Sequence, residues 1–163
     1  MKRILLCGIL FLAVLLVGCG GKNTDFLAPF GTSYVAEVTG TLCGIDFSAT
    51  VERGEATEGV CVPTTVTFYA PSALSGTTLT RAADGSVTVK SGGLAVGDMG
   101  GIGASLFDLF PISGAISHTE VTSEGHTRLT VGNATVELLA DGTPYSVKTA
   151  DVSAVVVNWK GEK

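Results

Sequence analysis

Few side chains in this sequence could carry out acid–base or nucleophilic chemistry. The chain contains two histidines, His118 and His126. A Ser-His-Asp arrangement would need Ser113 or Ser117 beside His118, with Asp108 as the third member. Neither serine lies in the Gly-x-Ser-x-Gly turn that exposes such a nucleophile in hydrolases. We therefore expect a protein that is not an enzyme and has no catalytic residues, with both histidines facing solvent in a hairpin.

Patterns that would hold a cofactor or a metal ion are incomplete. The segment 101–106 begins like a dinucleotide-binding loop, but Leu106 stands where the third glycine belongs. Cys43, Cys61 and the two histidines lack the spacing of metal ligands. The sequence therefore predicts no cofactor and no metal site.

The N-terminal segment has the layout of an export signal. Lys2 and Arg3 precede an apolar run over 4–17, which is shorter than the roughly 20 residues a membrane-spanning helix needs. The run closes in Leu16-Val17-Gly18-Cys19, which resembles the lipobox of bacterial lipoproteins. The resemblance implies that 1–18 is removed, that Cys19 is acylated, and that the chain is anchored in the cell membrane, facing outside the cytoplasm. The alternatives are an ordinary signal peptide and an uncleaved anchor.

The expected mature chain divides into a lipidated tether, 19–30, and one β-rich domain, 31–163. Its 145 residues suit a single domain with a hydrophobic core. Removal of two basic residues with the signal takes the formal net charge from −5 to −7. This charge argues against nucleic acid and against electrostatic adhesion to anionic lipid. Phe26, Leu27 and Phe30 are expected to dock the tether onto the domain; the oligomeric state stays open.

Two cysteines of the mature domain are candidates for a disulfide, because export leads to an oxidising environment. If 45–53 and 60–69 pair as a hairpin, Cys43 lies about nine strand residues from Cys61, roughly 30 Å away. A direct bridge would then require a different pairing. The alternatives are a disulfide between Cys43 and Cys61 or two buried, unreactive thiols.

Alternating apolar and polar residues predict a largely antiparallel sheet. Tyr34, Ala36 and Val38 share one side of a strand, and equivalent alternation recurs along the chain. Turn residues every eight to twelve positions indicate nine or ten short strands, with one hairpin over 77–90 and another over 116–131. The last segment, with apolar residues on both faces, is typical of a central strand.

One segment departs from the period of two. Leu106, Leu109 and Phe110 follow Ile102 at helical spacing, and a proline follows the run. We expect a short amphipathic helix near 102–110 that covers the open face of a curved sheet.

The order of these elements is similar to that of the LolA-like family. The similarity rests on a strand over 60–70 ending in Ala70-Pro71, the Leu74-Ser75-Gly76 turn, the Asp84-Gly85 hairpin and an apolar helix after a glycine-rich loop. Members of that family are curved antiparallel half-barrels whose concave face and helices enclose a hydrophobic cavity. The resemblance implies a mainly β, LolA-like half-barrel that holds a lipid or a lipidated partner protein. The chain departs from the family in leaving little room for a helix before the first strand.

Two functions are compatible with these features. The first is a non-enzymatic lipoprotein that binds an apolar ligand in the half-barrel cavity, because hydrophobic ligands need concave apolar pockets. The second is a cell-surface interaction module with a filled core and no small ligand, because packing alone explains the same residues. The candidate lining consists of large apolar side chains from the expected strands and helix: Phe47, Val66, Phe68, Leu106, Phe107, Leu109 and Phe110.

Overall fold

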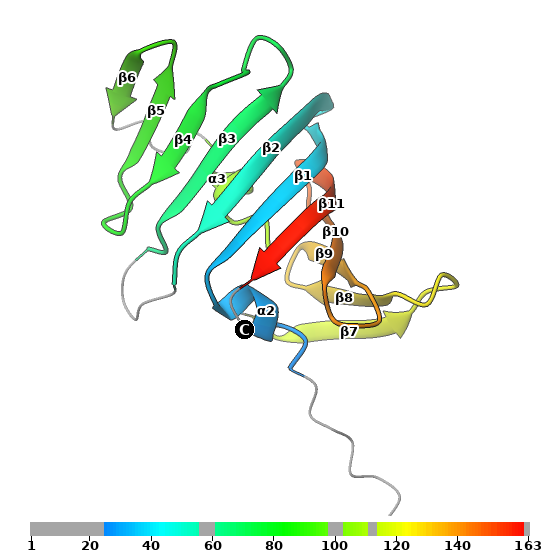
Figure 1. Ribbon diagram of the computed structural model, residues 1–163. Coiled ribbons are helices and arrows are strands. Elements are labelled where there is room, and N and C mark those ends of the chain that lie inside the picture. The colour runs from blue at the N-terminus through cyan, green and yellow to red at the C-terminus, as the bar shows by residue number, and fades with distance from the viewer. Residues whose placement is uncertain (1–24, 56–60, 98–102, 111–113, 162–163) are drawn as a thin grey trace, which may run out of the picture.

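The protein is built around one curved antiparallel sheet (Figure 1). The computed structural model describes residues 25–55, 61–97, 103–110 and 114–161, so the predicted export signal, Cys19 and Ser113 lie outside the described residues. The strands are β1 (Tyr34–Leu42), β2 (Ile45–Arg53), β3 (Thr64–Ala70), β4 (Thr78–Arg81), β5 (Val87–Ser91), β6 (Leu94–Gly97), β7 (Ile116–Val121), β8 (Thr127–Val131), β9 (Ala134–Leu138), β10 (Pro144–Lys148) and β11 (Val152–Gly161).

The sheet is open, with β6 at one edge and β7 at the other. Its order is β6-β5-β4-β3-β2-β1-β11-β10-β9-β8-β7. The last strand, β11, therefore lies in the middle of the sheet, next to the first strand, β1. This confirms the mainly β class, the curved antiparallel half-barrel and the central place of the last strand. The described residues form eleven strands rather than nine or ten, and bulges such as the one at Glu37/Val38 increase the local twist.

Alternation along the strands decides which side chains form the core. Tyr34, Ala36 and Val38 of β1 are buried, and the residues between them are exposed. Among the described residues, the hydrophobic core draws on side chains from Phe26 to Trp159. On β11 the convex face departs from the expected two-sided burial, because Val155 and Val157 are exposed there.

Two one-turn helices complete the described fold. The helix α3 (Ala104–Phe107) lies against the concave face, as Figure 1 shows, and is shorter than the predicted range of 102–110. The helix α2 (Ala28–Gly31) lies at the end of the sheet where the N-terminal segment enters. Neither helix has the length and apolar character needed to cross a bilayer. Phe30 is fully buried and Phe26 and Leu27 pack on the core, which confirms their predicted docking.

Candidate functional site

The seven predicted lining residues all belong to the single buried core of the described structure. All are buried, with exposed fractions of 3% or less. The rings of Phe47 and Phe68 pack edge to face, with centroids 6.4 Å apart, and Phe110 stacks on Phe30 at 5.5 Å. Side chains from α3 and the loop after it fill the concave face, and packing accounts for the burial of all seven residues.

An aromatic cluster closes the end of the half-barrel beside α2. Phe110 and Trp159 meet edge to face at 5.4 Å, and Tyr34 stacks on Trp159 at 4.4 Å. Phe30 of α2 contacts both Phe110 and Trp159. These rings come from α2, β1, β11 and the segment after α3. Their contacts therefore pack α2 and the adjoining end of the sheet against the core.

A pocket of about 600 Å³ opens on the outer side of this cluster, and we call it the tether pocket. Its walls come from α2, the β9–β10 turn and the end of β11. None of the seven predicted lining residues belongs to it. The tether pocket is lined by Asp25, Phe26, Ala28, Pro29, Thr32, Leu138, Asp141, Gly142, Thr143, Trp159, Lys160 and Gly161.

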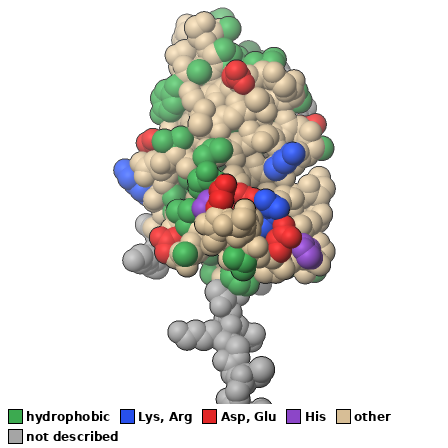
Figure 2. Space-filling view, turned by 90° about the vertical axis from the view of Figure 1, so that its right-hand side faces the viewer, with side chains coloured by type: hydrophobic (Ala, Val, Ile, Leu, Met, Phe, Trp, Pro, Cys, Tyr) green, Lys and Arg blue, Asp and Glu red, His purple; other side chains and the backbone are tan. Residues whose placement is uncertain are grey.

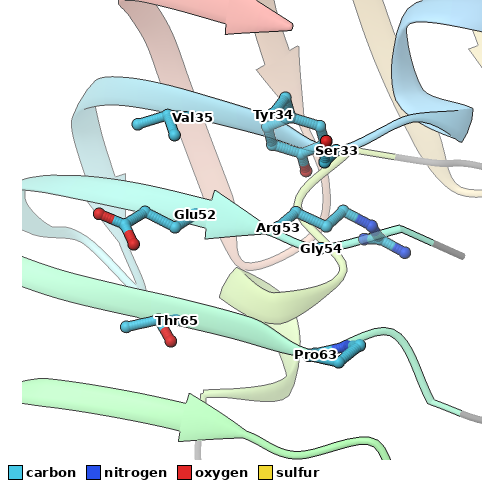
Figure 3. Close-up of a pocket in the computed structure, with 8 residues that line it drawn as sticks. All are labelled: Ser33, Tyr34, Val35, Glu52, Arg53, Gly54, Pro63 and Thr65. Atoms are coloured by element: carbon cyan, nitrogen blue, oxygen red, sulfur yellow. The ribbon is translucent and has the colours of Figure 1, made fainter. Parts of the chain in front are cut away.

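A second pocket, of about 400 Å³, lies at the ends of β1, β2 and β3, and we call it the strand-end pocket (Figure 3). It takes in Tyr34 and Arg53, which both belong to the buried side of the sheet. Glu52 also lines the pocket but is exposed, because neighbouring residues of a strand point to opposite faces. The strand-end pocket is lined by Ser33, Tyr34, Val35, Glu52, Arg53, Gly54, Pro63 and Thr65.

A row of polar residues crosses the sheet next to the strand-end pocket. Tyr34 pairs with Arg53, Arg53 with Thr64, and Thr64 with Arg81, so the four lie in register on β1 to β4. Arg53 is 4% exposed, and its Nη1 donates to the carbonyl oxygen of Phe107 at 3.3 Å. The row therefore places two guanidinium groups against α3.

Burial controls the ionisation of Tyr34. Desolvation raises the pKa of the phenol to about 12, although the nearby Arg53 and Arg81 lower it. Asp108 adds to the rise. The hydroxyl is buried, and no well-oriented hydrogen bond joins it to another group within the described part of the chain. Tyr34 therefore presents a neutral, unpaired hydroxyl at neutral pH.

The residues of the conceivable Ser-His-Asp set have other partners. Ser117 Oγ donates to the carbonyl oxygen of Thr130, and both carboxylate oxygens of Asp108 accept from Arg81 at 3.0 and 3.2 Å. His118 is exposed, as predicted. The prediction for His126 is wrong in one respect: its ring packs on Tyr145 at 4.4 Å and its side chain is only 16% exposed.

Charged side chains form a network on β7, β8 and β9 that the sequence analysis missed. Arg128 bonds Glu120 of β7 at 2.7 Å and Glu137 of β9 at 2.7 Å. Figure 2 shows acidic, basic and histidine side chains gathered on the lower part of this face. These hydrogen bonds hold the pKa of Glu120 below its usual value and raise the pKa of Arg128. The charged groups of this network pair with one another, so they offer little unpaired charge to a ligand.

Both cysteines of the described chain carry free, exposed thiols. Cys43 lies in the β1–β2 turn with a left-handed backbone (φ 49°), and Cys61 precedes β3. β2 pairs with β3 as the hairpin considered in the sequence analysis, and this pairing places the two thiols far apart along the strands. The expectation of buried thiols is therefore wrong, and no bridge joins them. Within the described ranges, no group of three or more histidine, cysteine or acidic residues is placed to hold a metal ion.

Comparison with known proteins identifies the fold but no family. No family model and no curated protein matches the chain. An uncharacterized conserved protein from Thermus thermophilus superposes with a TM-score of 0.52 at 16% identity, covering 85% of each chain. MucB superposes with a TM-score of 0.48 at 11% identity over 89% of this chain and 60% of MucB. MucB in complex with MucA(peri) gives 0.45 at 12% identity, over 86% and 56%. The similarity to the Thermus protein concerns the fold alone.

Proposed function

We propose that this chain is a lipid-anchored protein of the cell envelope that binds an apolar ligand without catalysing a reaction, and that the ligand enters the tether pocket. The observation that carries the proposal is the position of this pocket. Asp25 belongs to its wall and lies only six positions after Cys19 in the sequence. Six residues span at most roughly 20 Å, so an acylated Cys19 would hold the pocket close to the membrane surface.

The size and lining of the tether pocket suit an acyl chain. Its volume of about 600 Å³ lies within the usual range for pockets that bury small ligands. Phe26, Pro29, Leu138 and Trp159 supply apolar walls, and Lys160 adds a charged group. Such a lining favours an amphiphile whose hydrocarbon part is removed from water.

The space beneath α3 is a weaker candidate for the same ligand. The side chains there already pack as a core, with Leu109 fully buried and Phe107 1% exposed. An acyl chain would have to displace these side chains, which would lose their own packing. The proposal therefore moves the ligand from the predicted cavity to the tether pocket.

A second candidate function, an interaction module without a small ligand, is favoured by the filled core and the two open sheet edges. Every residue of β6 and β7 is exposed, and Leu94 and Val96 of β6 expose 77% and 52% of their surface. Open edge strands offer unpaired backbone groups to which a partner can add a strand.

Binding of a fluorescent fatty acid separates the two candidates. The expected mature chain, 19–163 carrying Cys19→Ser, contains every described residue of the core and is the protein used for the test. Ala28→Trp would fill the tether pocket from α2. Ala73→Trp, in the exposed β3–β4 loop at the other end of the sheet, is the matched control.

We expect saturable binding that Ala28→Trp weakens at least tenfold and Ala73→Trp leaves unchanged. No binding by any variant would support the interaction module. Equal binding by both tryptophan variants would place the ligand elsewhere and contradict the proposal.

The same chain should stay unlabelled by serine-reactive probes, and labelling of Ser113 or Ser117 would contradict the non-enzymatic role.

A further inference from the structure

The polar row contains an excess of buried positive charge. The side chain of Arg53 is buried, with 4% exposed, and it donates a hydrogen bond to a neutral group, the carbonyl oxygen of Phe107. Among the described residues, no carboxylate forms an ion pair with it. A buried guanidinium without a negative partner is costly, because desolvation is repaid only by close opposite charge.

Arg81 adds a second guanidinium to the same face. It lies two strands from Arg53 in the row, with its Cζ 5.2 Å from the centre of the Phe107 ring. Asp108 neutralises it through two hydrogen bonds, but the buried Nε of Arg81 has no hydrogen-bond partner among the described residues. The row and α3 together therefore carry two positive charges against one negative charge.

The neighbouring hydroxyl is also unsatisfied. Tyr34 is 3% exposed, and among the described residues its hydroxyl forms no well-oriented hydrogen bond, although the guanidinium of Arg53 lies close enough to lower its pKa. Burial keeps this group neutral, so it can donate a hydrogen bond at any physiological pH. Buried polar groups in folded proteins are almost always paired, so an orphaned hydroxyl beside a guanidinium without a counter-charge calls for an explanation.

The strand-end pocket gives access to these groups. Tyr34 and Arg53 belong to its lining, and Gly54 and Ser33 continue it past the ends of the strands. Figure 3 shows the Arg53 side chain directed past Gly54, away from the carboxylate of Glu52. Glu52 is on the exposed face of β2, so it does not neutralise Arg53.

We propose that the strand-end pocket is a binding site for an oxyanion, a carboxylate or a phosphate, held by the guanidinium of Arg53 and the hydroxyl of Tyr34. An Arg fork matches the two oxygens of such a group, and a phenol donates to one of them. This site is separate from the tether pocket and does not depend on the function proposed for it. The anion can be free in solution or part of a lipid headgroup.

The single tryptophan of the chain provides the readout. Trp159 stacks on Tyr34 with ring centroids 4.4 Å apart, so an anion beside the Tyr34 hydroxyl should change its emission. The chain 19–163 with Cys19→Ser is titrated with inorganic phosphate and with acetate, at constant ionic strength set by sodium chloride. We expect a saturable change with at least one of the two anions.

Three variants assign the change to the site. Arg53→Gln removes the positive charge and should weaken binding at least tenfold. Arg53→Lys keeps the charge and should bind with intermediate affinity, because it loses the fork. Tyr34→Phe, which removes one oxygen atom and leaves the ring stack, should weaken binding several-fold. Arg128→Gln, at an arginine on the far side of the sheet from the pocket, is the control and should bind like the unchanged chain.

Vesicles distinguish the two sources of the anion. Binding to phosphatidylglycerol but not to phosphatidylcholine vesicles, lost in Arg53→Gln, would identify a lipid headgroup. Binding of free phosphate or acetate alone would identify a soluble anion.

The site is refuted if neither anion gives a saturable change. It is also refuted if Arg53→Gln and Tyr34→Phe, both shown by circular dichroism to be folded, bind like Arg128→Gln. Ala28→Phe, which obstructs the tether pocket without adding a second tryptophan to the emission, should leave anion binding unchanged, so failure of the tether pocket would not be confused with failure of this site.

Discussion

At the scale of single residues, burial determines what Tyr34 can do. Its pKa of about 12 lies above the ordinary value of 10.0, and desolvation is the largest cause. The folded state therefore holds the proton of Tyr34 at a pH where the unfolded chain has released it. The stability that follows is fully present below pH 10 and is lost as the pH rises from 10 towards 12.

We predict that Tyr34→Phe reduces the alkaline loss of stability. A shift of two pKa units corresponds to about 2 to 3 kcal/mol, so the fall in unfolding free energy between pH 10 and 12 should shrink by this order. Below pH 10 the variant should be at least as stable as the unchanged chain, because it removes an unpaired buried hydroxyl.

Urea unfolding at a series of pH values measures this effect. Tyr69→Phe, at a tyrosine whose side chain is 57% exposed, is the matched control. Parallel alkaline curves for Tyr34→Phe and the unchanged chain would show that burial does not control this phenol.

Phe110 tests the packing of the aromatic cluster. It is 1% exposed and contacts Phe30, Tyr34 and Trp159. We predict that Phe110→Ala lowers the unfolding free energy by about 3 to 5 kcal/mol, because it leaves a cavity in a filled core.

The control for Phe110→Ala is Leu94→Ala, at a side chain that is 77% exposed on β6. It should change the stability by no more than about 0.5 kcal/mol. Equal effects of the two substitutions in denaturant unfolding would contradict a filled concave face.

Some residues of the sites could be found in the sequence, and others could not. Phe47, Ala49 and Val51 define the buried side of β2, and Arg53 continues that alternation. An arginine at a core-facing position was therefore a signal of the polar row. The contact of His126 with Tyr145 joins β10 to the β7–β8 turn, and no local pattern predicts such a long-range contact.

At the scale of elements, the pairing of β1 with β11 joins the first described strand to the last. The strands pair along their length from Tyr34↔Gly161 to Leu42↔Val152. Gly40 lies opposite Ala154, and a Cβ at Gly40 would collide with the backbone oxygen of Ser153 and lie 2.6 Å from the Cα of Ala154. A glycine is needed there because the obstacle is backbone, which cannot move aside without opening the ladder.

We predict that Gly40→Ala destabilises the fold by about 3 kcal/mol, through forced separation of β1 and β11. Thermal unfolding followed by circular dichroism measures the loss. Gly97→Ala is the matched control in a strand, because a Cβ at Gly97 has no neighbour within 4 Å. A Gly40→Ala protein as stable as Gly97→Ala would contradict the observed register.

Alternation predicted most strands because their buried face follows a strict period of two, as in β1 and β9. It did not predict the bulges, since the bulge between Pro144 and Ser146 shifts Tyr145 out of the pattern. The helix α3 was predicted from its apolar spacing but is only one turn long. Leu109 and Phe110 are buried beyond its end, so their burial follows from packing and did not require a longer helix.

At the scale of the whole molecule, the half-barrel places both pockets at the end of the sheet that receives the N-terminal segment. Thr32 belongs to the tether pocket and Ser33 to the strand-end pocket, so the two lie on either side of the start of β1. The open sheet with a covering helix was predictable from the order of turns and strands. The pockets were not, because their walls combine α2, the β9–β10 turn and the end of β11, which only the tertiary fold brings together.

The predicted anchor can be tested by substitution of its acceptor. Cys19→Ala removes the thiol that would carry the diacylglycerol. The two acyl chains of that group would anchor the protein stably in a membrane. We expect the variant to move to the soluble fraction or to keep its signal segment. Cell fractionation followed by intact-mass measurement gives the answer, and unchanged membrane residence of a cleaved Cys19→Ala chain would contradict the lipobox.

The most direct test of the central claim is to map where an apolar ligand binds. The chain 19–163 with Cys19→Ser is irradiated with a photoactivatable fatty acid, and the labelled peptides are identified by mass spectrometry. The account predicts labels on the walls of the tether pocket, at 25–32, 138–143 and 159–161, that excess unlabelled fatty acid abolishes. Labels on α3 and the strands beneath it, or no competable label at all, would contradict it.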